Sequence, residues 1–190
     1  MKLEGILPFA RSLLRSAVQN GETVVDATVG NGHDTLFLAQ LVGEEGHVFG
    51  FDIQKEAIHN TTKRLEEEGL INIVTLYHQG HEELSTSIPP HYHGKIKGAI
   101  FNLGYLPGGD KSVVTKPNTT ITAIRQLIEM LAPEGMIVLV IYHGHAEGRI
   151  ERDSLLTFVK ELDQKKAHVL QYQFINQENN PPFIIAIEKR

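Results

Sequence analysis

Short β-branched runs alternate with segments of helical periodicity along most of this chain, and this alternation limits the fold more than any other feature of the sequence. The clearest unit is a β-branched run at residues 23–27, a glycine-containing loop and an apolar-periodic segment at residues 35–41. We expect strands at residues 23–27, 47–52, 72–76, 96–102, 135–142, 167–174 and 183–188, and helices at residues 6–19, 35–41, 54–68, 119–131 and 149–162.

Strands that alternate with helices form a mostly parallel sheet with helices on both faces. The last two expected strands have no helix between them, which indicates an antiparallel hairpin at the end of the chain. The expected fold is therefore an α/β, Rossmann-like, seven-stranded sheet. At 190 residues, the chain has room for one such domain spanning residues 1–190.

Composition excludes several other classes of protein. The chain has no cysteine, so it has no disulfide or thiolate metal site, which fits a cytoplasmic protein. No apolar run approaches the ~20 residues of a membrane helix, and we read no signal peptide in residues 1–15. The net charge of -5 gives no overall attraction to nucleic acid, so any RNA-binding surface must be local.

Basic residues that could form such a surface are scattered along the sequence, and scattered basic residues are usually only part of a solvated face. They are Arg11, Arg15, Lys95, Lys97, Lys111, Lys116, Arg149 and Arg152.

The loop after the first expected strand is a candidate ligand site. In open α/β sheets, ligands bind beyond the carboxyl ends of the strands. Gly30 and Gly32 would allow close approach of a ligand to the backbone, although a simple chain reversal would also use them. Asp52 ends the second expected strand, where a carboxylate can accept hydrogen bonds from ribose hydroxyls or cap the helix that begins near Gln54.

The charge around the loop favours one kind of cofactor. A nicotinamide dinucleotide would place a pyrophosphate at the helix N-terminus, where nearby carboxylates are unfavourable. Asp26 and Asp34 flank this loop. The pattern therefore favours S-adenosylmethionine, which has a cationic methionine tail and no phosphate.

Three motifs together resemble a known family. The segments at residues 26–35 (DATVGNGHDT), 101–110 (FNLGYLPGGD) and 142–145 (YHGH) resemble those of a small bacterial family of class I methyltransferases. Its members were earlier labelled rRNA methylases and are assigned as tRNA 5-aminomethyl-2-thiouridine methyltransferases. The resemblance covers nearly the whole chain and implies a class I methyltransferase fold, S-adenosylmethionine as cofactor and a tRNA anticodon as partner.

The resemblance also implies a set of site residues. Asp26, Asn31, Gly32, Asp34 and Thr35 would surround the methionine tail, Asp52 and Gln54 would hold ribose and adenine, and Gly80 and His81 would border the adenine. The cofactor site as a whole comprises Asp26, Thr28, Gly30, Asn31, Gly32, Asp34, Thr35, Asp52, Gln54, Gly80, His81 and Asn102.

The segment Asn102-Leu103-Gly104-Tyr105 resembles the Asn-Pro-Pro-Tyr loop of methyltransferases that act on nitrogen. There the Asn oxygen accepts hydrogen bonds from the target amine and the aromatic ring stacks on the base. The expected catalytic residues are Asn102, Tyr105 and His143, with His143 as a substrate contact or proton acceptor. The expected substrate-binding residues are Leu106, Pro107, Tyr142 and His145. We expect no metal site.

The implied reaction is methylation of the aminomethyl group on the wobble uridine of tRNA. Methylation of rRNA or of a small amine, and a non-catalytic nucleotide-binding module, are the alternatives. A homodimer is a further possibility, because two copies would gather scattered basic residues into one surface.

Overall fold

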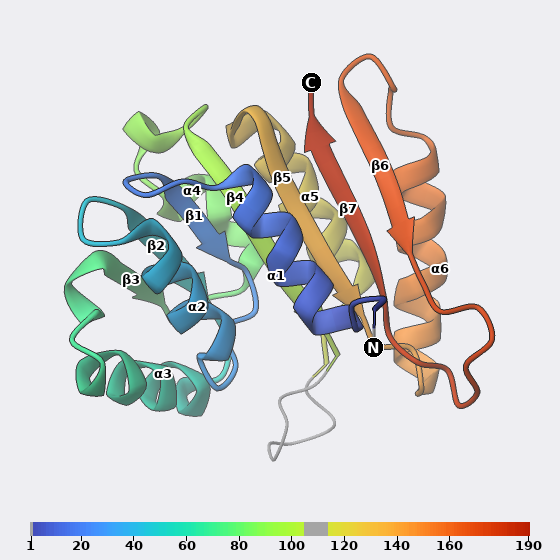
Figure 1. Cartoon of the computed structure of the whole chain (residues 1–190), viewed down its shortest axis with the longest axis horizontal. Coiled ribbons are helices and arrows are strands. Elements are labelled where there is room, and N and C mark those ends of the chain that lie inside the picture. Colours follow the sequence, from blue (N-terminus) through green and yellow to red (C-terminus); the bar gives the residue numbers. More distant parts are fainter. Residues whose placement is uncertain (1, 105–113) are drawn as a thin grey trace.

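The computed structural model describes residues 2–104 and 114–190 (Figure 1). Within these residues, one sheet has the strand order β3-β2-β1-β4-β5-β7-β6. Strands β1 to β5 are parallel, whereas β7 is antiparallel to both β5 and β6. The strands are β1 Thr23–Asp26, β2 His47–Phe51, β3 Val74–Tyr77, β4 Ile96–Leu103, β5 Leu131–Ile141, β6 Ala167–Tyr172 and β7 Phe183–Lys189.

Helices cover both faces of the sheet, and each face has its own apolar core (Figure 1). On one face, Leu14, Leu38 and Leu65 are fully buried against the strands. On the other face, Ile124 and Leu155 are buried in the same way. The first face carries α1 Ile6–Ala17, α2 His33–Val42 and α3 Lys55–Glu67, and the second carries α4 Leu84–Ser87, α5 Pro117–Met130 and α6 Ala146–Lys160. No helix of the described residues is long and apolar enough to cross a membrane.

Strand order reverses between β1 and β4, and this reversal positions the site. β1 pairs with β2 on one side and with β4 on the other. The connections that leave β1 and β4 therefore run to opposite faces of the sheet, and a crevice forms between them at the carboxyl edge. The loop after β1 and the end of β4 are neighbours there.

The observed sheet confirms the expected seven strands, the mostly parallel arrangement and the antiparallel C-terminal pair. Three local details differ. Residues 71–73 form a 3-10 turn, so β3 begins at Val74. The polar connection at residues 85–94 includes the end of the short helix α4. β5 begins at Leu131, before Pro133, because an irregular register with β4 accommodates the proline.

Candidate active site

The loop between β1 and α2 has a fixed shape at the carboxyl edge of the sheet. Its turn uses positive φ angles of 54° at Gly30 and 76° at Gly32, which residues with a Cβ rarely adopt. A Cβ on Gly32 would lie 2.6 Å from Oγ1 of Thr61 on α3. The same helix holds the loop directly, since Thr61 Oγ1 donates to the Gly30 carbonyl at 3.1 Å and Arg64 Nε donates to the Asn31 carbonyl at 3.0 Å.

Asp26 lies fully buried at the end of β1. Its carboxyl group accepts hydrogen bonds from Thr35 Oγ1 at 2.6 Å and from the Thr28 backbone N–H at 3.2 Å. Burial raises the pKa of Asp26 to about 7, and the neighbouring charge of Asp34 adds to this effect. Asp26 therefore stabilises the loop after β1 through these two hydrogen bonds, and its protonation changes near neutral pH.

Asp52 joins the end of β2 to the loop after β1. Its Oδ2 accepts a hydrogen bond from the Gly30 N–H at 2.9 Å, and its Oδ1 accepts one from the Gln54 N–H at 2.9 Å. Each carboxylate oxygen has a further lone pair with which to accept a ligand hydroxyl. Beside it, the Ile53 side chain is 55% exposed and offers an apolar surface to a flat ring.

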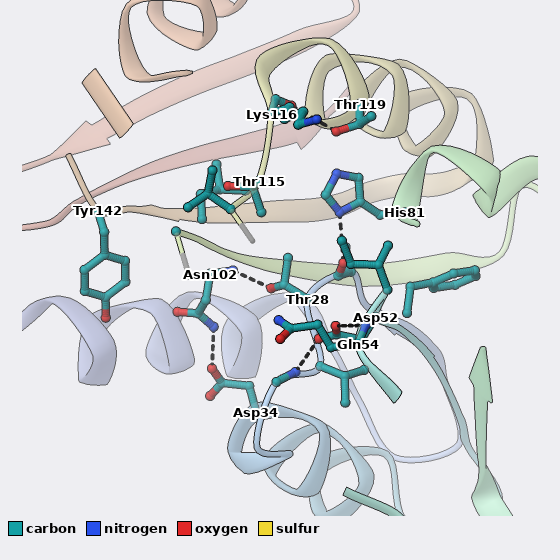
Figure 2. A pocket seen from close by; sticks show the side chains of 18 of the residues that line it. Thr28, Asp34, Asp52, Gln54, His81, Asn102, Thr115, Lys116, Thr119 and Tyr142 are labelled. Carbon is teal, nitrogen blue, oxygen red and sulfur yellow. Dashed lines mark hydrogen bonds between the residues drawn. The ribbon is translucent and has the colours of Figure 1, made fainter. Parts of the chain in front are cut away.

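His81 holds the segment after β3 in place at the site. Its Nδ1 lies 3.1 Å from the Ala27 carbonyl, which requires a proton on Nδ1, and its ring packs edge-on against Phe101. Burial lowers the pKa of His81, so the ring is neutral. His81 thereby ties the segment after β3 to the loop after β1 (Figure 2).

Asn102, near the end of β4, is held at two points by residues of the loop and of α2 (Figure 2). Its backbone N–H donates to Thr28 Oγ1 at 2.7 Å. Its side-chain Nδ2 donates to Asp34 Oδ2 at 2.7 Å. The other oxygen of Asp34 accepts from Arg11 of α1, with Nη2 at 2.7 Å and Nε at 3.0 Å.

Tyr142 and His143 follow β5 and reach the same cavity. Tyr142 is 38% exposed, and its ring extends beside Asn102 toward α1 (Figure 2). His143 is buried, and its Nδ1 lies 3.4 Å from Arg152 Nη1. Arginine only donates, so this contact requires an unprotonated Nδ1. Burial, and then the charge of Arg152, lowers the pKa of His143.

Glu151 of α6 is a buried carboxyl group that sequence reasoning did not identify. It accepts hydrogen bonds from Thr115 Oγ1 at 2.5 Å and from Thr120 Oγ1 at 2.7 Å. Burial raises the pKa of Glu151. Glu151 thus joins α6 to the start of α5 and to Thr115. The backbone N–H of Thr115 in turn donates to the Gly104 carbonyl at 3.1 Å.

One cavity of about 890 Å³ contains most of the expected site residues. It is lined by Thr28, Gly30, Asn31, Asp34, Asp52, Gln54, Gly80, His81, Asn102, Tyr142, His143 and His145. Asp26, Gly32 and Thr35 are buried outside this lining. Tyr105, Leu106 and Pro107 lie outside the described residues.

The cavity wall also includes residues that the sequence did not point to, among them Leu7, Ile53, Thr115 and Thr119. Arg11 was identified only as one of several basic residues, and its partner Asp34 lies 23 positions away. A pair so far apart leaves no periodic signal. Within the described residues, no group of three His, Asp or Glu side chains could hold a metal ion.

The lining fits a nucleoside with a cationic tail. Asp52 provides acceptors for hydroxyl groups and Ile53 provides an apolar surface, as an adenosine requires. Asp34 stands in the first turn of α2. A pyrophosphate at that helix N-terminus would meet its carboxylate, whereas an ammonium or sulfonium group would be favoured.

Comparison with known proteins agrees with this chemistry. A family model described as "Putative rRNA methylase" matches residues 48–188. The chain is 33% identical, over 95% of its own length and 68% of the relative, to the chloroplastic tRNA (mnm(5)s(2)U34)-methyltransferase of Arabidopsis thaliana. A "putative rRNA-methylase" structure from Clostridium thermocellum has a TM-score of 0.96 at 47% identity, with 100% of both chains covered. A "putative methyltransferase" from Streptococcus mutans in complex with SAH has a TM-score of 0.89 at 38% identity, covering 99% of both chains.

The fold and the site together define a class I S-adenosylmethionine-dependent methyltransferase. Within that class, the chain belongs to the family described as "Putative rRNA methylase". The cofactor is S-adenosylmethionine, as the sequence predicted.

Proposed function

We propose that this enzyme methylates the amino nitrogen of 5-aminomethyl-2-thiouridine at the wobble position of tRNA. The observation that carries the proposal is the likeness, along 95% of this chain, to a relative described as a tRNA (mnm(5)s(2)U34)-methyltransferase. The arrangement of Asn102 supports an amine substrate, because an amide oxygen at the end of β4 can accept a hydrogen bond from an N–H group.

The chain contributes mainly alignment to this reaction. When bound, S-adenosylmethionine supplies a methyl group on a cationic sulfur: the S–CH3 bond would break as the unprotonated amine forms an N–CH3 bond, S-adenosylhomocysteine would leave, and the new ammonium would lose its proton to water. Asn102 Oδ1 accepts an N–H of the amine and thereby directs the nitrogen lone pair. Because such a displacement needs reacting atoms in line, holding the amine in one orientation lowers the barrier substantially.

Aromatic residues would hold the base. The ring of Tyr142 is partly exposed beside Asn102 and can pack against a pyrimidine ring (Figure 2). The roles expected for Tyr105, Leu106 and Pro107 in substrate binding stay predictions, as does that of His145.

We propose that His143 acts as a substrate contact or proton acceptor, the two roles that the sequence predicted. Its Nδ1 lies 3.4 Å from Arg152 Nη1, and the backbone carbonyl of Pro181 also interacts with the ring. No hydrogen-bond partner of Nε2 lies among the described residues.

The proposed RNA partner is the anticodon stem-loop, with the target base unstacked into the cavity. Lys116 lines the cavity and can contact phosphate oxygens near the base. We expect the reaction in the cytoplasm, since the chain has no cysteine. A homodimer, which would combine basic residues of two copies, is a prediction for light scattering to test.

A second candidate substrate is rRNA. It is favoured by the description of the matching family and by that of the Clostridium thermocellum structure. The same amine-aligning site would then act on a different nucleotide.

Transfer by the purified protein distinguishes the two substrates. Protein, cofactor and either tRNA or rRNA from cells that lack the gene are incubated, and the digested nucleosides are analysed by mass spectrometry. The proposal predicts one added methyl group on 5-aminomethyl-2-thiouridine of tRNA. Methylation of rRNA with none on tRNA would support the second candidate and contradict the first.

A further inference from the structure

Asn102 makes a contact that determines which way its side-chain amide points. Its Nδ2 donates to Asp34 Oδ2 at 2.7 Å. A carboxylate only accepts, so the reverse orientation of the amide would set two oxygen acceptors against each other. The nitrogen must therefore face Asp34, and the carbonyl oxygen Oδ1 must face the opposite way.

Asp34 is itself held in place by Arg11. Two guanidinium nitrogens of Arg11 contact Oδ1 of Asp34, at 2.7 and 3.0 Å, and leave Oδ2 to Asn102. The two oxygens thus have different partners, one on α1 and one on β4. Charged hydrogen bonds of this kind are stronger than neutral ones and restrict the carboxylate to one rotamer.

The backbone of Asn102 is also held by a hydrogen bond. Its N–H donates to Thr28 Oγ1 at 2.7 Å. With backbone and amide nitrogen both restrained, Oδ1 points toward the space beside Tyr142, away from Asp34 (Figure 2). An acceptor that is oriented before the substrate arrives costs no reorganisation during the reaction.

We propose that Asp34, with Arg11 as its counter-ion, is a positioning residue that turns the Asn102 carbonyl oxygen toward the amine substrate. This inference rests on the proposed role of Asn102 as the acceptor of the amine N–H. It differs from the expectation that Asp34 serves mainly to bind the methionine tail. The two roles separate experimentally, because one acts on the transfer rate and the other on cofactor affinity.

The first test is a double-mutant cycle on Asp34 and Asn102, with bulk RNA from cells lacking the gene as the methyl acceptor. Measured at saturating S-adenosylmethionine, so that any change in cofactor affinity is removed, Asp34→Ala should lower kcat by about 10- to 100-fold because the amide is misaligned. In the Asn102→Ala background, Asp34→Ala should have no further effect on kcat, since the residue acts through the missing amide. Asp34→Asn keeps an acceptor oxygen for Asn102 and should retain more activity than Asp34→Ala.

A matched control removes a carboxylate from an exposed ion pair on α3. Glu67→Gln breaks the Lys63–Glu67 pair and should leave kcat and Kd unchanged. Independent, multiplicative losses in the cycle would overturn the proposal. So would an Asp34→Ala variant with weakened cofactor binding but normal kcat at saturating cofactor.

A second measurement does not depend on activity. In the 1H–15N spectrum, the side-chain amide of Asn102 is identified by its disappearance in Asn102→Ala. Its resonance should shift strongly in folded Asp34→Ala, which has no acceptor for the amide, and an unchanged resonance in this variant would contradict the proposal. If the wild-type enzyme methylates no RNA, the proposed function fails, whereas this spectrum still decides whether Asp34 orients the amide.

Discussion

The Asp52 carboxylate accepts a hydrogen bond from the Gly30 N–H at 2.9 Å, which joins the end of β2 to the loop after β1. Two residues that are 22 positions apart in the sequence thus lie side by side in one wall of the cavity. Asn102 stands on the opposite side of that loop, on β4, and contacts Thr28 and Asp34. Under the proposed function, this arrangement separates the half of the cavity that would hold the cofactor from Asn102, which would contact the substrate.

Asp52→Ala should therefore impair cofactor binding before it impairs transfer. The variant loses acceptors for ribose and releases the Gly30 N–H, and the loss of hydrogen bonds to a charged group corresponds to about a tenfold or larger increase in Kd. Calorimetric titration with SAH measures this change. Normal affinity in Asp52→Ala would contradict the assignment.

Gly32→Ala should destabilise the protein and weaken cofactor binding. The new Cβ would require φ of 76° and would lie 2.6 Å from Thr61 Oγ1, and backbone strain of this kind costs about 1–3 kcal/mol even without the clash. Gly69→Ala is the matched control, since Gly69 has φ of 71° and nothing within 4 Å of its Cβ position. Urea unfolding should show a larger loss for Gly32→Ala, and equal losses would mean that the Thr61 contact adds nothing.

The stability of the protein should depend on the protonation of Asp26. Its pKa of about 7 in the folded state lies above the ordinary value of 3.8. Between these values the folded state holds a proton that the unfolded chain has lost, so the contribution of Asp26 to stability falls as pH rises through this interval.

Asp26→Asn removes that titration. The stability of the variant relative to wild type should rise between pH 5 and pH 8 by more than about 1 kcal/mol, because one pKa unit corresponds to ~1.4 kcal/mol. Urea unfolding of both proteins at the two pH values measures the difference. A difference that is the same at pH 5 and pH 8 would show that Asp26 does not titrate in this range.

Glu151→Ala should lower the free energy of unfolding by about 2–3 kcal/mol, because it leaves the hydroxyl groups of Thr115 and Thr120 without their buried acceptor. Glu151→Gln keeps an acceptor oxygen and should cost less. Glu161→Ala, at an exposed position at the end of the same helix, is the control. Equal stability of Glu151→Ala and the control would mean that this cluster does not hold α5 and α6 together.

Local sequence patterns predicted the fold and the position of the loop at which the candidate cofactor site lies. Gly30, Gly32 and Asp52 could be placed because a strand, a glycine loop and an acid at a second strand end follow one another along the chain. The motif at Asn102 was visible for the same reason. Each of these signals depends on neighbours in sequence and on the period of one element.

The contacts that fix the site were not predictable in this way. Arg11–Asp34 and Glu151–Thr115 join residues 23 and 36 positions apart, and only the folded sheet brings them together. The early start of β5 was also missed, because Pro133 indicated a break that the irregular register with β4 absorbs. Such features depend on packing between elements and leave no periodic pattern.

The most direct test of the account is the nucleoside composition of tRNA in cells without the gene and in the same cells supplied with wild-type or Asn102→Ala protein. Mass spectrometry should show 5-aminomethyl-2-thiouridine accumulating without the gene, its methylated form restored by the wild type, and little restoration by Asn102→Ala. Unchanged wobble uridines in the deletion strain would contradict the account.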